Sequence, residues 1–68
     1  MNVKNIIRER RKKLAMTQVD LAKKAGIHQS CVSKIENGTT YPSLGLVSKV
    51  MESLGLELVI KSNKNEDK

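Results

Sequence analysis

The sequence predicts a mainly α-helical domain of four helices with one β-strand at its C-terminal end. Apolar residues recur three and four positions apart in four successive segments, as on one face of an α-helix. Capping side chains and glycines, which start and stop helices, separate these segments. Residues 56–61 instead place apolar side chains at every second position, which is the period of a strand. With 68 residues, the chain is expected to form one small domain with a thin core.

The first predicted helix carries a stripe, mostly of apolar residues, at i, i+3, i+4 and i+7 spacing. The stripe consists of Val3, Ile6, Ile7, Arg10 or Arg11, and Leu14. The second helix should begin at Thr17, because Thr17 and Asp20 have the spacing of a side-chain cap for the free amides of a helix start. Met16, just before this cap, is expected to pack into the core.

Gly26 ends the second helix, since glycine readily adopts the left-handed conformation that turns the chain sharply. Apolar residues repeat at helical spacing before it, namely Leu21, Ala22 and Ala25. The third helix is predicted over residues 29–36, with Val32 and Ile35 buried. It stops at Asn37-Gly38.

A fourth helix is predicted between Ser43, a good N-cap residue, and Gly55, which ends it. Its buried face is expected to contain Leu44, Val47, Val50, Met51 and Leu54. Residues 63–68 are all polar or charged and are expected to be disordered. The folded domain should therefore comprise residues 1–62.

The net charge of +6 is placed entirely in one half of the sequence. Residues 1–38 carry nine basic and three acidic side chains, whereas residues 39–68 carry four of each. A basic half of this kind is typical of a domain that binds a polyanion. The alternative is that the basic residues merely solvate one helix; these are Arg8, Arg10, Arg11, Lys12 and Lys13.

The composition narrows the class of partner. Proteins that bind single-stranded nucleic acid stack bases on aromatic rings, and this chain has one Tyr, no Phe and no Trp, so duplex DNA is favoured. One Cys and one His argue against a disulfide framework, a zinc cluster and an enzyme, and no cofactor is expected. The sequence shows neither a membrane-spanning run nor a signal peptide, which predicts a cytoplasmic protein with no membrane partner.

Residues at fixed spacings resemble the helix-turn-helix domains of phage repressors and Cro proteins. They are Thr17-Gln18, Leu21-Ala22, Gly26, Ser33, Ile35-Glu36-Asn37-Gly38 and Pro42-Ser43. The resemblance extends from about Ile6 to Leu54. It implies a four-helix, lambda-repressor-like fold whose third helix lies in the major groove of duplex DNA.

The polar residues of the third helix are the candidate base contacts, namely His28, Gln29, Ser30, Ser33 and Lys34. Gln29 is the first choice, because a glutamine amide can bind N6 and N7 of adenine together. The short Ser30 and Ser33 side chains let the helix lie deep in the groove. Lys34 fits a phosphate or a guanine at the edge of the site, and His28 fits a base edge, a phosphate or neither.

The candidate phosphate contacts are Thr17, Gln18, Thr39 and Thr40. Gln18 lies in the first turn of the second helix, where its side chain and nearby backbone amides should bind a phosphate at the positive end of the helix dipole. Thr39 and Thr40 follow the glycine that ends the third helix.

The resemblance also implies an ion pair between Arg11 and Glu36 that joins the first and third helices and holds the scaffold. Cys31 has two interpretations, a redox switch and a packing residue of the third helix, and its position among small residues favours packing. No residue is expected to be catalytic or to bind a metal.

The predicted strand would leave backbone amides and carbonyls unpaired if it stood alone. We therefore expect it to pair antiparallel with the same strand of a second subunit, across a two-fold axis. The interface would contain Leu56, Leu58, Val59 and Ile60. The alternative is an extended tail that rests on the helices of its own chain.

A helix-turn-helix followed by Leu54-Gly-Leu-Glu-Leu-Val-Ile60 is similar to the HipB-type antitoxins, which neutralise HipA-type kinase toxins. This resemblance implies a homodimeric repressor of its own operon, with an inverted-repeat operator and a kinase toxin as partners. The alternatives are a stand-alone phage-type repressor or restriction-modification controller, and an interaction protein that mainly clamps a toxin.

Overall fold

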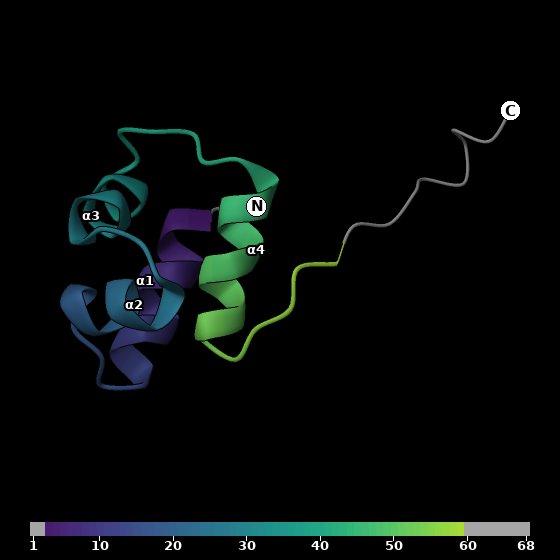
Figure 1. The fold of residues 1–68 in the computed structure, drawn as a ribbon. Coiled ribbons are helices and arrows are strands. Elements are labelled where there is room, and N and C mark those ends of the chain that lie inside the picture. The colour runs from purple at the N-terminus through teal and green to yellow at the C-terminus, as the bar shows by residue number, and fades with distance from the viewer. Residues whose placement is uncertain (1–2, 60–68) are drawn as a thin grey trace, which may run out of the picture.

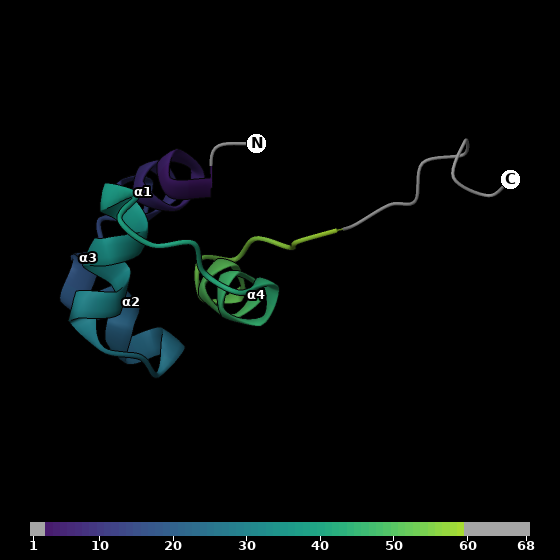
Figure 2. The same ribbon diagram turned by 90° about the horizontal axis from the view of Figure 1, so that it is seen from above.

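The structure is a computed structural model that describes residues 3–59. It contains, in order, α1 (Val3–Lys13), α2 (Gln18–Ala25), α3 (Gln29–Asn37) and α4 (Leu44–Ser53) (Figure 1). α3 packs against α1 and α2, and α4 packs against α2. Seen from above, α4 lies beside the other three helices, with its axis nearly along the line of sight (Figure 2). The four predicted helices are confirmed.

The core consists of apolar side chains that all four helical segments contribute. Its fully buried members are Ile7, Leu21, Ala22, Val32, Ile35, Val50 and Leu54. Met16 and Cys31 pack against this cluster while remaining half-buried, so the predicted packing of both side chains is confirmed. Val47 and Met51 are also buried, as their spacing on α4 predicted.

Two of the predicted core residues are exposed, and both predictions were wrong. Leu14 is 42% exposed, because α1 ends at Lys13 and the helical period no longer directs the next side chain inward. Leu44 is 63% exposed. It is the first residue of α4, and helical side chains tilt towards the N-terminus, so this one extends beyond the packed part of the helix.

The two short connections before α3 have backbone angles in the left-handed region. Gly26 adopts φ 72° after α2, and its amide donates to the carbonyls of Ala22 and Lys23, as expected for a glycine helix stop. Ala15, between α1 and α2, adopts φ 58° although it carries a Cβ. Non-glycine residues enter this region at a cost, so tertiary contacts must hold this turn.

The segment after α4 forms no strand within the described residues. Residues 56–59 continue from the end of α4 as an extended segment (Figure 1), whereas Ile60 and Lys61 lie outside the described part, as does the tail predicted to be disordered. Leu56 and Leu58 are half-buried, and Glu57 and Val59 are exposed, so the predicted alternation is present. A strand is defined by hydrogen bonds to a neighbouring strand, and the single chain supplies none here. Pairing across a dimer therefore stays a prediction.

Candidate nucleic-acid interface

The start of α2 is fixed by reciprocal hydrogen bonds between Thr17 and Asp20. The Asp20 amide donates to Thr17 Oγ1 (3.0 Å), and the Thr17 amide donates to Asp20 Oδ2 (2.9 Å). The hydrogen bonds from the Thr17 backbone and then from its side chain hold the pKa of Asp20 below its ordinary value. The Thr17 hydroxyl accepts from the Asp20 amide in this cap, and its proton must turn away from the Asp20 carboxylate before it can donate to a phosphate oxygen.

A buried carboxylate joins three elements behind this helix start. Arg11 Nε and Nη2 donate to Glu36 Oε2 and Oε1, at 2.7 and 2.9 Å, in a bidentate pair between α1 and α3. Arg11 Nη1 also donates to the Met16 carbonyl at 2.8 Å, which ties the same guanidinium to the α1–α2 turn. The side chains of Arg11 and Glu36 are only 11% and 3% exposed.

Gln18 is the second residue that donates to this carboxylate, and the sequence did not lead us to expect this contact. Its Nε2 donates to Glu36 Oε1 at 3.2 Å. A glutamine amide has two N–H donors, so one remains for the phosphate contact predicted for Gln18. The bond to Glu36 orients the amide before any ligand is bound.

The charge state of Glu36 follows from these contacts. Burial opposes ionisation, but the hydrogen bonds from Arg11 and Gln18, with the nearby charges of Arg11 and Arg8, outweigh it. Together they hold the pKa of Glu36 below its ordinary value. The hydrogen bond to Glu36, against the opposing effect of burial, raises the pKa of Arg11 above its ordinary value. Both groups are therefore charged at neutral pH.

α3 presents a polar face on the side opposite its buried residues. Gln29 and Ser33, and likewise Ser30 and Lys34, are four residues apart and so share one face of the helix. Gln29, Ser30 and Lys34 are exposed, and Ser33 is half-buried. His28 is exposed at the N-cap, where its side chain makes no capping hydrogen bond. The structure thus places all five predicted base-contact residues at accessible positions on or next to α3.

The two threonines after α3 differ in their contacts. Gly38 adopts φ 76°, and the Thr39 amide and hydroxyl both donate to the Lys34 carbonyl, at 3.1 and 3.3 Å. The Thr39 hydroxyl must release this bond before it can donate to a phosphate. Thr40 is exposed on the following loop.

Sequence reasoning missed a polar hollow that gathers around the Gln18–Glu36 bond. It has a volume of about 320 Å³ and is lined by Arg8, Arg11, Lys12, Gln18, Glu36 and Asn37. Arg8 and Lys12 are exposed and four residues apart on α1, so they share a face next to the start of α2. The i, i+4 spacing of Arg8 and Lys12 could have predicted that these two side chains lie together. Other basic residues surround them in the sequence, so the pair did not stand out.

The structure also locates the residues predicted for the dimer interface. Leu56 packs against the domain's own core, Leu58 lines a groove beside α4, and Val59 is 60% exposed. Ile60 lies outside the described residues. Between residues 3 and 59, no three His, Cys, Asp or Glu side chains gather as metal ligands would. None of the described helices has the length and apolar character needed to cross a membrane.

Two short helices joined at Gly26, with the second presenting a polar face from a basic scaffold, define a helix-turn-helix DNA-binding domain. The chain belongs to the helix-turn-helix family of the phage-repressor type (XRE), whose family model matches residues 7–60. It is accordingly a DNA-binding transcriptional regulator.

Three similar proteins carry related names. An "Uncharacterized HTH-type transcriptional regulator" of Methanothermobacter thermautotrophicus is 36% identical over 55 residues, which cover 81% of this chain and 80% of the relative. The regulator y4dL of Sinorhizobium fredii is 38% identical over 58 residues, covering 85% of this chain but 30% of the relative. Antitoxin HipB of Escherichia coli O6:H1 is 41% identical over 49 residues, covering 72% of this chain and 52% of the relative. No solved structure gave a significant match.

Proposed function

We propose that the protein is a homodimeric, sequence-specific repressor whose α3 lies in the major groove of duplex DNA. The observation that carries this proposal is the exposed polar face of α3. The helix-turn-helix lies in residues 1–38, which hold the whole positive net charge of the chain. The Gln29 amide binds the edge of a base, and adenine fits it best. The short side chains of Ser30 and Ser33 allow α3 to approach the floor of the groove closely. Lys34 contacts a phosphate or a guanine, and His28 lies at the edge of the site.

Phosphate contacts fix the domain on the duplex. The Thr17 hydroxyl, the second N–H of Gln18 and the first amides of α2 converge at the positive end of the α2 dipole. Thr39 and Thr40 contact the backbone on the other side of α3. Arg8 and Lys12 add positive charge beside the Gln18 site.

The dimer places two α3 helices in successive major grooves roughly 34 Å apart, so the operator is an inverted repeat. Antiparallel pairing of residues 56–61 from two copies satisfies the backbone groups that a single chain leaves without a strand partner. The alternation along the extended segment, with Leu56 and Leu58 half-buried and Glu57 and Val59 exposed, supports this arrangement.

We further propose that the repressor is the antitoxin of a HipA-type kinase toxin and regulates its own operon. The similarity to antitoxin HipB and the Leu54–Ile60 pattern support this step. The second candidate is a stand-alone repressor or restriction-modification controller. The regulator from M. thermautotrophicus, which is matched over 80% of its length, supports the transcriptional regulation that both candidates share.

The test separates DNA binding from toxin binding. The double variant Gln29→Ala/Ser33→Ala should lose the operator, measured by fluorescence anisotropy with duplex DNA from upstream of its own gene. The same variant, expressed untagged in the native host, should still co-purify with a kinase. Operator binding without any co-purifying kinase supports the stand-alone repressor. A kinase adjacent in the genome that co-purifies with a protein unable to bind DNA supports the interaction-protein alternative.

A further inference from the structure

Arg10 occupies a position of α1 at which the helical pattern favours an apolar side chain. It continues the stripe of Val3, Ile6 and Ile7, and it is half-buried. Its Nε donates to the Leu54 carbonyl at 2.9 Å, 44 positions further along the chain. A charged side chain on the inner face of a helix is normally paired, and here the partner is the end of α4. The DNA contacts described above do not use Arg10.

The end of α4 receives from Arg10 a positive charge that its own sequence lacks. Between residues 50 and 53, the last turn of α4 as the structure describes it contains no basic residue. The Leu56 amide donates to the Met51 carbonyl at 2.8 Å, and the Leu54 carbonyl accepts from Arg10. Carbonyls at the C-terminus of a helix carry the negative end of its dipole, where a cation is stabilising. Arg10 therefore caps α4 from α1.

The C-terminal segment leaves the domain directly beside this guanidinium. Gly55 follows the capped carbonyl and adopts φ 73°, in the left-handed region. A Cβ at Gly55 would lie 3.5 Å from Arg10 Nη2, so the guanidinium lies against the turn itself. Leu56 then packs against the core and begins the extended segment. The Arg10 contact thus lies where the direction of this segment is set.

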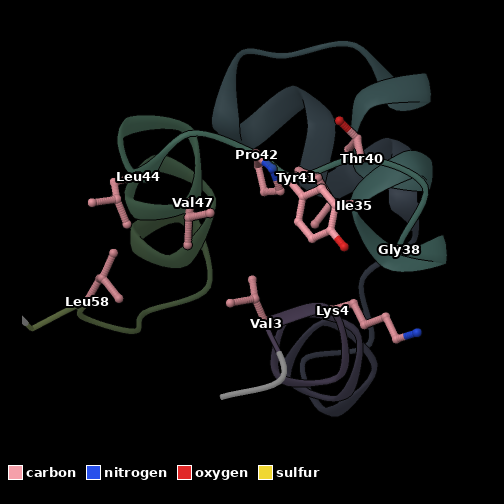
Figure 3. A pocket seen from close by; sticks show the side chains of 10 residues that line it. All are labelled: Val3, Lys4, Ile35, Gly38, Thr40, Tyr41, Pro42, Leu44, Val47 and Leu58. Atoms are coloured by element: carbon pink, nitrogen blue, oxygen red, sulfur yellow. The ribbon is translucent and has the colours of Figure 1, made fainter.

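Apolar packing holds α4 against α1 less firmly than against α2. The contact between α4 and α2 is the more extensive of the two. Beside the start of α1, an apolar groove of about 580 Å³ lies between α1, α3 and α4 (Figure 3). Val3 and Val47 face each other across it, and Tyr41 and Leu58 also line it. The hydrogen bond from Arg10 therefore has a large share in fixing the end of α4 relative to α1.

The neighbouring Arg11 makes the corresponding tie between α1 and α3, through its bidentate pair with Glu36. Two consecutive residues of α1 thus bind the last part of α3 and the end of α4. We propose that Arg10 is a positioning residue for operator binding, which fixes the direction of the segment after α4 relative to α3. This inference rests on the homodimer of the proposed function, in which that segment joins two copies and so sets the distance between their α3 helices.

The preference for one operator spacing tests this role. One base pair inserted between the half-sites separates them by about 3.4 Å more and rotates them by about 35°. The wild-type full chain should bind the inserted site at least tenfold more weakly than the operator from upstream of its own gene, in fluorescence anisotropy. Arg10→Met keeps a long side chain that suits the inner face of α1 but cannot donate, and it should lower this ratio to threefold or less. Equal ratios for the two proteins would overturn the proposal.

Lys13→Met is the matched control, because it removes the same charge from an exposed position of α1. It should weaken binding to both sites alike and so keep the wild-type ratio. If Lys13→Met relaxed the spacing preference as much as Arg10→Met, loss of charge would be the cause and the proposal would be overturned.

Amide hydrogen exchange followed by NMR measures the Arg10 contact without DNA. In Arg10→Met, the Leu56 amide should exchange at least tenfold faster than in the wild type, whereas the amide of Val50, buried in α4, should change less than threefold. Equal acceleration at both amides would show a loss of global stability and would overturn the positioning role. A wild-type chain that stays monomeric or binds no operator makes the proposed function fail, and the exchange rates then decide by themselves whether Arg10 holds the segment.

Discussion

Removal of the Glu36 carboxylate should destabilise the domain far more than removal of an exposed charge. Glu36→Ala leaves the Arg11 guanidinium, 11% exposed, without its bidentate acceptor and takes the acceptor of the Gln18 amide as well. Breaking a buried pair by removing one partner costs about 3–5 kcal/mol, because the remaining charge is uncompensated. Glu52 is exposed on α4, and Glu52→Ala should cost about 1 kcal/mol or less.

Thermal unfolding followed by circular dichroism measures this difference. For a domain of this size, 1 kcal/mol corresponds to about 4–8 °C, so Glu36→Ala should lower the Tm by more than about 12 °C. A domain of this length has a total stability of about 3–10 kcal/mol, so the variant should be measured in stabilising sulfate if it is partly unfolded at room temperature.

A double variant checks the physical reason for the loss. Arg11→Met/Glu36→Met removes both charges, so no buried charge is left without a partner, and it should recover part of the stability lost in Glu36→Ala. Equal Tm values for Glu36→Ala and Glu52→Ala would refute the scaffold role. A double variant less stable than Glu36→Ala would refute the explanation by an uncompensated charge.

Three further outcomes are expected. Gln29→Ala should weaken binding to the cognate operator by about 1–3 kcal/mol and leave binding to random duplex DNA unchanged in anisotropy titrations, and an equal loss on both would remove the base-reading role. Because the pKa of Glu36 is lowered on folding, its stabilisation is complete above the unfolded-state pKa of about 4.3 and is lost as the pH falls through the lower folded value. The urea midpoint of the wild type should therefore fall between pH 5 and 3 more than that of Glu36→Gln, and parallel curves would contradict this. Val59→Pro, which removes a mid-strand amide, should shift the protein towards the monomer and weaken operator binding; an unchanged dimer would show that the strand does not make the interface.

The helices and the α2 cap could be predicted because they depend on residues close together in the sequence. The Thr17–Asp20 box and the stops at Gly26 and Gly38 are local devices, and the structure has each of them. The burial of Val32 and Val50 followed from helical spacing alone.

Errors arose where the ends of helices or distant contacts decide the outcome. Helical spacing could not show that Leu44, the first residue of α4, is exposed, since its burial depends on which other residues pack against that end of the helix. The Gln18–Glu36 bond joins residues 18 positions apart, so no local pattern encodes it. The groove beside Tyr41 escaped prediction for the same reason, because its walls come from α1, α3, α4 and the segment after α4.

The left-handed Ala15 has a consequence for how the domain distributes its stability. An L-residue with a Cβ occupies this region at a cost of about 1–2 kcal/mol, a substantial share of what so small a core provides. The Arg11 bond to the Met16 carbonyl helps to hold the strained turn in place. Since Ala15 is exposed and lies outside α3 and the groove beside α4, glycine or asparagine there relieves the strain without altering either surface. A substitution that relaxes this turn therefore raises the free energy of unfolding of the domain. It can offset a destabilising substitution elsewhere, so that a variant too unstable to fold alone becomes measurable.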